Sequence, residues 1–205
     1  MTRAAVTLAV DTLARRDPVF ATLVKRFGPP PAPARSRPSA RFEVLVRAIV
    51  YQQLAGRAAQ AIHGRLVAVL GDEVTPERIL STPQATLRSA GLSTAKTAAI
   101  TDLADKVASG HVALERIARL TDEDVVAHLV QVRGIGVWTA EMFLISNLGR
   151  PDVWPVGDLG VRGGYAKAWQ LDSVPTPKGL MELGERYRPF RTVVAMYCWQ
   201  VMDAK

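Results

Sequence analysis

The sequence predicts an all-α fold of about ten short helices arranged in two lobes. Apolar residues recur at spacings of three and four along most of the 205 residues, which is the period of helices with one buried face. Ser, Thr and Asp residues that can cap helices precede several of these segments. No stretch alternates convincingly between apolar and polar residues, and Pro151 and Pro155 disfavour a strand in residues 152–156.

Two helices are expected ahead of a proline-rich connector. Residues 4–14 and 18–27 have helical periodicity. Residues 28–38 contain five prolines and therefore predict a stiff, extended linker. We expect residues 1–39 to pack with the C-terminal helices of residues 141–205.

Residues 40–140 are expected to form a helical lobe of their own. Its segments are residues 42–54, residues 58–70 with Gly56 near the junction, a short helix opened by Thr75 and Pro76, another starting at residues 81–83, a longer one from residues 92–96 to about 109, and one from the acid-rich residues 121–124 to about 132.

Composition favours a globular protein with a polyanionic partner. Hydrophobic residues make up 48% and charged residues 22% of the chain, which excludes wholesale disorder. Twenty-six Lys and Arg against 19 Asp and Glu give a formal net charge of +7. This charge supports nucleic-acid binding only in combination with other features.

The few cysteines and histidines exclude several kinds of site. Cys198 is the only cysteine, so neither an internal disulfide nor a four-thiolate iron–sulfur cluster is possible, and its apolar neighbours predict a buried thiol. His63, His111 and His128 lack ligand spacing, which argues against a catalytic zinc. Without a signal peptide or membrane-spanning segment, we expect a cytoplasmic protein, associated with the nucleoid in a bacterium.

The most informative segment is residues 129–142, which contains the turn Gly134-Ile135-Gly136 between two helix-patterned stretches. A helix that begins at such a turn offers unpaired backbone N–H groups to a phosphate. About twenty residues later, residues 155–158 place Asp158 in a turn at the start of another helix. Together they indicate an enzyme that acts on a nucleotide.

The chain resembles the helix-hairpin-helix DNA glycosylases that carry a Gly/Pro-rich loop and an Asp. The resemblance is carried by residues 129–142 and 155–158, and also by residues 48–54, 91–96 and 197–199. The chain is most similar to the alkylpurine branch, DNA-3-methyladenine glycosylase II, in its compact form. The resemblance implies a two-lobed helical fold. It also implies that the protein is a monomer and that its partner is double-stranded DNA that contains damaged bases. We expect no N-terminal β domain.

The resemblance implies that Asp158 is catalytic in hydrolysis of an N-glycosidic bond. A carboxylate there would stabilise the oxocarbenium-like sugar and orient or deprotonate the attacking water. Asp158 is also a good helix N-cap, worth about 1 kcal/mol, and one residue can do both. Bifunctional relatives have a lysine nucleophile where this chain has Trp138, so a monofunctional enzyme that leaves an abasic site is expected.

An aromatic pocket would attract a base made cationic by alkylation. The pocket residues implied by the resemblance are Trp138, Met142, Trp199 and Tyr51. Ordinary packing is the alternative for Trp138 and, more strongly, for Trp199. Met142 stands where a relative has Tyr, and Tyr51 where a small residue is usual, so Tyr51 can stack on a base, plug the pocket or reach DNA.

Flipping a base out of the duplex requires a side chain that fills the gap. The resemblance assigns Gln52, Gln53 and Leu54 to this wedge, with Gln53 inserted; the alternative is that Gln53 is merely a polar residue at a helix end. The sequence-independent phosphate contacts are expected from the N–H groups of three hairpin residues, Gly134, Gly136 and Thr139.

No cofactor is expected to be required. In relatives, a monovalent cation, Na⁺ or K⁺, bridges the hairpin to a phosphate, and the matching carbonyls here belong to Val130, Val132 and Ile135. Gly160, Gly163 and Gly164 follow Asp158, and each is about 1 kcal/mol less favourable than Ala in a helix. This helix is therefore either loosely held or closely approached by another backbone.

Three functions are compatible with these residues. The first is excision of alkylated purines of the 3-methyladenine type. The second is excision of another lesion, such as a deaminated or etheno base. The third is a helix-hairpin-helix module that binds DNA without chemistry, against which Asp158 and the aromatic pocket argue.

Overall fold

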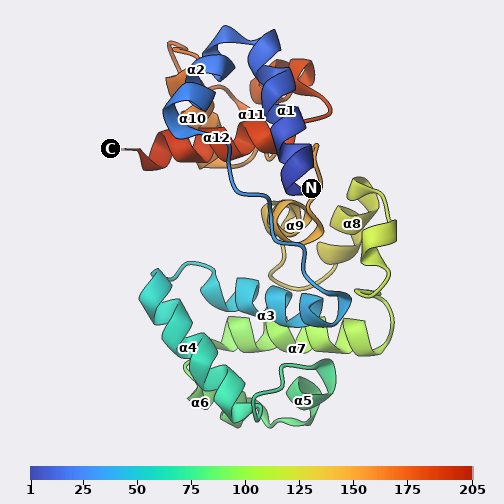
Figure 1. The fold of residues 1–205 in the computed structure, drawn as a ribbon. Coiled ribbons are helices and arrows are strands. Elements are labelled where there is room, and N and C mark those ends of the chain that lie inside the picture. Colours follow the sequence, from blue (N-terminus) through green and yellow to red (C-terminus); the bar gives the residue numbers. More distant parts are fainter. Residues whose placement is uncertain (205) are drawn as a thin grey trace. The chain divides into compact units, whose positions relative to one another are not determined.

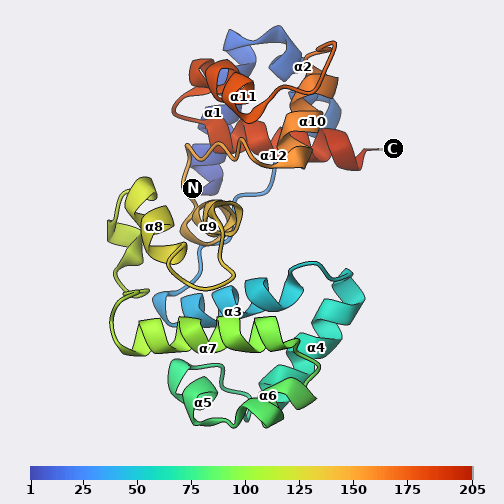
Figure 2. The same cartoon turned by 180° about the vertical axis from the view of Figure 1, so that it is seen from behind.

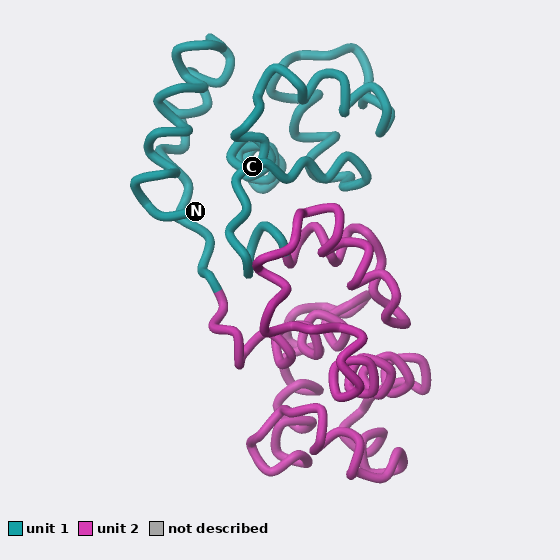
Figure 3. The backbone as a smooth tube through the Cα atoms, turned by 90° about the vertical axis from the view of Figure 1, so that its right-hand side faces the viewer, with its two compact units in different colours: residues 1–35, 144–205 teal, residues 36–143 magenta. Residues whose placement is uncertain are grey.

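The computed structural model describes residues 1–204, and every regular element in this range is helical (Figure 1). The predicted all-α fold is therefore confirmed. The described residues divide into two compact units (Figure 3). Unit 1 consists of residues 1–35 and 144–205, and unit 2 of residues 36–143.

Unit 2 is built on two helices, α3 and α7, that lie side by side (Figures 1 and 2). Its elements are the short 3₁₀ turn Pro38–Ala40, α3 (Arg41–Tyr51), α4 (Gly56–Val69), α5 (Pro76–Ser81), α6 (Gln84–Ser89), α7 (Thr94–Ala108), the 3₁₀ turn Ile117–Arg119, α8 (Asp122–Leu129) and α9 (Val137–Phe143). Leu45 and Ile49 of α3 and Ile100 and Leu103 of α7 are buried, since each helix places apolar residues three and four apart on one face.

Unit 1 is formed by the two ends of the described chain. Its elements are α1 (Arg3–Arg16), α2 (Pro18–Phe27), the π-helical segment Leu144–Leu148, α10 (Leu159–Ala168), α11 (Pro177–Gly184), the 3₁₀ turn Glu185–Tyr187 and α12 (Arg191–Asp203). Helix α12 packs against α1, α2 and α10. The N-terminal helices thus share one core with the C-terminal helices.

The buried carboxylate of Asp17 ties the N-terminal helices to the rest of unit 1. It caps α2 by accepting hydrogen bonds from the N–H groups of Val19 and Phe20 at 2.9 and 3.2 Å. It also accepts hydrogen bonds from the Tyr187 hydroxyl at 2.8 Å and the Trp169 indole at 3.0 Å. Burial alone would raise the pKa of Asp17, but these four hydrogen bonds hold the pKa below its ordinary value.

The three glycines of α10 permit close packing rather than loosening the helix. A Cβ on Gly164 would lie 2.1 Å from the carbonyl oxygen of Cys198 in α12, so only a glycine allows the two backbones to approach. Of the two alternatives drawn from the sequence, close approach by another backbone is the correct one. Cys198 itself is fully buried, and burial raises the pKa of its thiol.

Two helices end about three residues earlier than the sequence pattern indicates. Helix α3 ends at Tyr51 rather than at residue 54, since Gln52 has an extended ψ of 132° and Gln53 then adopts a φ of +55°. Helix α8 ends at Leu129 rather than near residue 132. In both places the chain turns early, and the residues freed from the helix are those singled out as candidate DNA contacts or cation ligands.

Candidate active site

Asp158 is the residue at which the turn of residues 155–158 becomes helix α10. The N–H of Asp158 donates to the carbonyl of Pro155 at 2.9 Å, which closes the turn. Its Oδ1 accepts the N–H of Val161 at 2.7 Å, so the capping role considered from the sequence is present. The same oxygen accepts a hydrogen bond from the indole Nε1 of Trp199 at 3.0 Å.

Trp199 therefore orients the carboxylate as well as filling space. It lies on α12 and is half-buried. A Cβ on Gly160 would lie 3.0 Å from the Trp199 ring and 3.1 Å from Oδ1 of Asp158, so the absence of a side chain at residue 160 gives the indole room to reach the carboxylate. Packing alone therefore does not describe Trp199, because its indole also donates a hydrogen bond to Asp158. Trp154, in contrast, is buried in the core and donates to the carbonyl of Leu180 at 2.8 Å.

The Gly134–Gly136 turn of unit 2 contacts residues of α7. Gly134 has a φ of +80°, and its position faces the Cβ of Ala99, which would be 3.2 Å from an added Cβ. The N–H of Arg133 donates to Oδ2 of Asp102 at 2.7 Å. The carbonyl of Val132 accepts the N–H of Ile135 at 3.0 Å. These contacts fix the turn without using the N–H groups expected to meet phosphate.

Helix α9 begins directly after the turn. The first hydrogen bond of the helix runs from the N–H of Ala140 to the carbonyl of Gly136 at 3.1 Å, so the N–H of Thr139 has no acceptor within the helix. The side chain of Thr139 is buried. Trp138 is 49% exposed, which disfavours its interpretation as a core residue, and Met142 is half-buried.

The four residues between α3 and α4, residues 52–55, form a loop that we call the wedge loop. Gln53 is exposed and adopts a left-handed backbone, and Leu54 is 39% exposed. The side chain of Gln52 points back to the hairpin, where its Nε2 donates to the carbonyl of Gly134 at 2.9 Å. The ammonium of Lys96 donates to the carbonyls of Val50 and Gln52 at 2.6 and 2.8 Å.

The Tyr51 ring contacts Arg47 of α3 and His63 of α4. The Arg47 guanidinium lies 4.9 Å from the centre of the Tyr51 ring, and the ring of His63 meets it edge-on at 6.3 Å. Burial, followed by the positive charge of Arg47, lowers the pKa of His63. Both contacts of the Tyr51 ring are therefore within unit 2.

Sequence reasoning missed the residues that hold these parts in place. The sequence pattern includes Lys96 only as the end of residues 91–96 and gives no role to Ala99 or Asp102. Their spacing of three residues on a helix was a usable signal, because such residues share one face.

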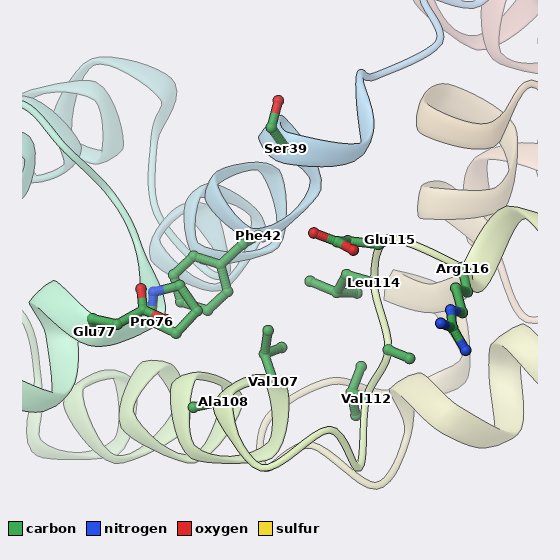
Figure 4. A pocket seen from close by; sticks show the side chains of 11 residues that line it. Ser39, Phe42, Pro76, Glu77, Val107, Ala108, Val112, Leu114, Glu115 and Arg116 are labelled. Carbon is green, nitrogen blue, oxygen red and sulfur yellow. The ribbon is translucent and has the colours of Figure 1, made fainter.

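A cavity of about 430 Å³ opens elsewhere in unit 2 (Figure 4). Part of its lining is apolar and comes from α3 and α7, and its edge carries charged side chains. The lining residues are Ser39, Phe42, Pro76, Glu77, Val107, Ala108, Val112, Ala113, Leu114, Glu115 and Arg116. None of these is a residue predicted to act on DNA.

Within residues 1–204, no three His, Cys, Asp or Glu side chains are grouped so that they could hold a metal ion. In the same range, no helix has both the length and the apolar character needed to cross a membrane.

Comparison with known proteins agrees with the helical fold. The family described as "HhH-GPD superfamily base excision DNA repair protein" matches residues 46–189. DNA-3-methyladenine glycosylase 1 of Schizosaccharomyces pombe is 37% identical over 162 residues, which are 78% of this chain and 71% of that protein. The chain belongs to the HhH-GPD superfamily, and the resemblance inferred from the sequence is confirmed.

Two solved structures are similar over nearly the whole chain. The structure of the S. pombe 3-methyladenine DNA glycosylase in complex with abasic DNA has a TM-score of 0.81 and 35% identity, covering 96% of this chain and 97% of that one. A DNA-3-methyladenine glycosidase from Bacillus halodurans has a TM-score of 0.85 and 32% identity, covering 94% and 88%.

Proposed function

We propose that this base excision repair protein is a monofunctional DNA glycosylase that removes alkylated purines of the 3-methyladenine type from duplex DNA. The observation that carries the proposal is Asp158, held at the start of α10 by Val161 and Trp199, in a chain of this superfamily. The substrate class is supported by the names of the similar proteins from S. pombe and B. halodurans.

Asp158 would act on the sugar rather than on the base. As the bond between C1′ and the purine nitrogen breaks, its electron pair leaves with the base and positive charge builds on the deoxyribose. The carboxylate stabilises that charge. A water oxygen then bonds to C1′ and loses a proton, which Asp158 can accept. The Trp199 hydrogen bond to Oδ1 keeps the carboxylate in one orientation during both steps.

The hairpin supports a hydrolytic reaction without strand cleavage. Cleavage by a bifunctional glycosylase needs an amine that attacks C1′ and forms a Schiff base. The residue two positions after Gly136 is Trp138, whose half-exposed ring has no such nucleophile and can instead stack on a cationic base. An abasic site with an intact backbone is therefore the expected product.

DNA would be held through its backbone and opened by the wedge loop. The N–H groups of Gly134, Gly136 and Thr139 are suited to a phosphate and do not distinguish sequences. Gln53 and Leu54 are exposed at the tip of the loop, where a side chain can enter the stack left by the flipped base. Gln52 differs, because its amide already bonds to the carbonyl of Gly134.

The carbonyls of Val130, Val132 and Ile135 suit a monovalent cation. They belong to residues 130–136, the segment between α8 and α9 that lies outside both helices. The Val132 oxygen accepts one hydrogen bond, from Ile135, and a carbonyl has a second lone pair. A bound Na⁺ or K⁺ would add positive charge beside the phosphate that the hairpin holds.

The test is release of free bases from methylated duplex DNA by the parent, Asp158→Asn and Asp172→Asn. Asp172 is an exposed carboxylate in a loop of unit 1 and serves as the matched control. The parent and Asp172→Asn should release methylated purines, with strand breaks only after alkali. Asp158→Asn should bind DNA but release bases at least about a hundredfold more slowly.

Other outcomes would redirect the proposal. Release of a deaminated or etheno base instead of methylated purines would overturn the substrate class. Equal release by Asp158→Asn and the parent would overturn the catalytic assignment. DNA binding by the parent without release of any base would indicate a non-catalytic module.

A further inference from the structure

Helix α7 contacts both DNA-facing segments of unit 2 with one face. Lys96, Ala99 and Asp102 are spaced three residues apart, so each shares a face of the helix with the next and together they cover about a third of its circumference. Lys96 reaches the end of α3, Ala99 lies under Gly134, and Asp102 accepts the N–H of Arg133. The wedge loop and the hairpin turn therefore both contact the same helix, α7, which we call their common support.

Lys96 is the contact between this support and the wedge loop. Its ammonium binds the carbonyls of Val50 and Gln52 at the C-terminal end of α3, where a cation is favoured by the helix dipole. These two carbonyls precede Gln53, whose left-handed backbone costs about 1 kcal/mol and needs support from its surroundings. Lys96 is half-buried, and its two hydrogen bonds place the ammonium at the point where α3 passes into the loop.

Gln52 closes the connection between the loop and the hairpin. Its carbonyl accepts from Lys96 at 2.8 Å while its side-chain Nε2 donates to Gly134 at 2.9 Å. Gln52 thus joins the loop to the turn whose backbone is expected to meet phosphate. Neither Lys96 nor Gln52 has to touch DNA in order to influence what Gln53 does.

We propose that Lys96 and Gln52 are positioning residues that fix the wedge loop to the hairpin, so that Gln53 enters the duplex in register with the phosphates held by the turn. This proposal rests on the proposed function, since it concerns how the same site opens DNA. Pre-ordering the loop removes an entropic cost that would otherwise be incurred on binding.

The test is a double-mutant cycle with Lys96→Met and Gln53→Ala. The readouts are affinity for a duplex that contains one tetrahydrofuran abasic-site analogue and the fluorescence of a 2-aminopurine placed opposite it. Each single variant should bind about tenfold more weakly than the parent and give less unstacking of the probe. The double variant should be no weaker than Gln53→Ala alone, because Lys96 acts through Gln53.

Gln52→Met provides a second, nearly isosteric variant that lacks the amide. It should also weaken binding and lose its effect in the Gln53→Ala background. Independent effects, with the double variant about a hundredfold weaker than the parent, would overturn the proposal, because general destabilisation adds in this way. Unchanged binding and fluorescence in Lys96→Met would overturn it as well.

Salt dependence separates positioning from direct phosphate contact. Lys178→Met, at an exposed lysine of α11 in unit 1, is the matched control for lost charge. If Lys96 positions the loop, Lys96→Met should lower affinity while keeping the parent's slope of log affinity against log salt. A slope reduced by about 0.9 would instead assign Lys96 to a phosphate and overturn the proposal.

The binding cycle does not depend on excision. Failure of the parent to release methylated purines would overturn the proposed function, while coupling between Lys96 and Gln53 on abasic-analogue DNA would still be measurable. Additive effects in an enzyme that does release purines would overturn the positioning roles alone.

Discussion

Units 1 and 2 hold their candidate functional residues in different ways. In unit 1, Asp158 sits at the start of α10, a helix packed so closely on α12 that Gly164 touches the backbone of Cys198. In unit 2, the wedge loop and the hairpin turn lie between helices and are fixed by hydrogen bonds that Gln52 and Lys96 donate and that Asp102 accepts. Close helix packing fixes the position of the Asp158 turn and the Trp199 hydrogen bond orients its carboxylate, whereas the two segments proposed to contact DNA are held mainly by side-chain hydrogen bonds.

This difference corresponds to the tasks proposed for the two units. A carboxylate that stabilises developing charge must be placed within a few tenths of an ångström, and close-packed helices provide such rigidity. A surface that meets phosphates must leave backbone N–H groups exposed, so apolar packing cannot cover it. Substitutions should therefore affect stability most in α10 and DNA binding most in the loops.

The largest effect is expected from Gly164→Ala in α10. Its Cβ would overlap the carbonyl of Cys198, so the free energy of unfolding should fall by about 3 kcal/mol. Gly64→Ala in α4 is the matched control, because nothing lies within 4 Å of its added Cβ. It should raise stability by about 0.5–1 kcal/mol. Denaturant unfolding measures both, and equal changes would refute the packing argument.

Gly134→Ala should weaken DNA binding more than it weakens the fold. A φ of +80° and the contact with Ala99 make the substitution unfavourable by about 2 kcal/mol, and relief of this strain would displace the turn. Affinity for duplex DNA should fall about tenfold. Gly110→Ala has a similar φ of +79° in open space, so it should lower stability while affinity stays at the parent's value.

Trp199→Phe tests whether the indole orients the carboxylate. The ring is kept but the hydrogen bond to Asp158 is lost, so single-turnover excision should slow about tenfold while the affinity for DNA is unchanged. Trp154→Phe removes a comparable bond, to Leu180, inside the core. It should reduce stability without slowing excision. A full excision rate in Trp199→Phe would restrict Trp199 to packing.

The smallest effect is expected for Asp17. Its ionised carboxylate stabilises the fold, and acid should remove this stabilisation by protonating it. Its pKa is lower in the folded than in the unfolded state, so the contribution is complete above the unfolded pKa of about 3.9 and is lost as pH falls through the folded pKa. Urea unfolding at pH 7, 4 and 3 should show this loss. Asp17→Asn should show a shallower decline below pH 4, and an identical decline would exclude Asp17 as its source.

The fold class and the hairpin could be predicted because both depend on local sequence. Helical periodicity extends over most of the chain, and Gly134 and Gly136 mark the turn. The hydrogen bond from Lys96 to the carbonyl of Gln52 could not be predicted, because the two residues meet only when α3 and α7 pack together. The same holds for the Trp199–Asp158 hydrogen bond, which joins residues 41 positions apart.

The early end of α3 has the same origin. The apolar pattern continues to Leu54, but residues 52–55 form a loop held by Lys96 and Gly134 from distant parts of the sequence. Tertiary contacts here overrule a helical pattern, and they do so at the segment proposed to enter DNA. Departure from local preference is therefore a marker of the functional loop.

Because unit 1 combines residues 1–35 with residues 144–205, its halves leave the ribosome at different times. Phe20 packs edge-on against Tyr197 at 4.8 Å, and these residues are separated by a synthesis time on the order of ten seconds. We expect residues 36–143 to resist proteolysis in stalled nascent chains before residues 1–35 do. Until α12 emerges, the apolar faces of α1 and α2 lack the helix that covers them in the folded unit, so the nascent chain is most prone to aggregation before α12 has been synthesised.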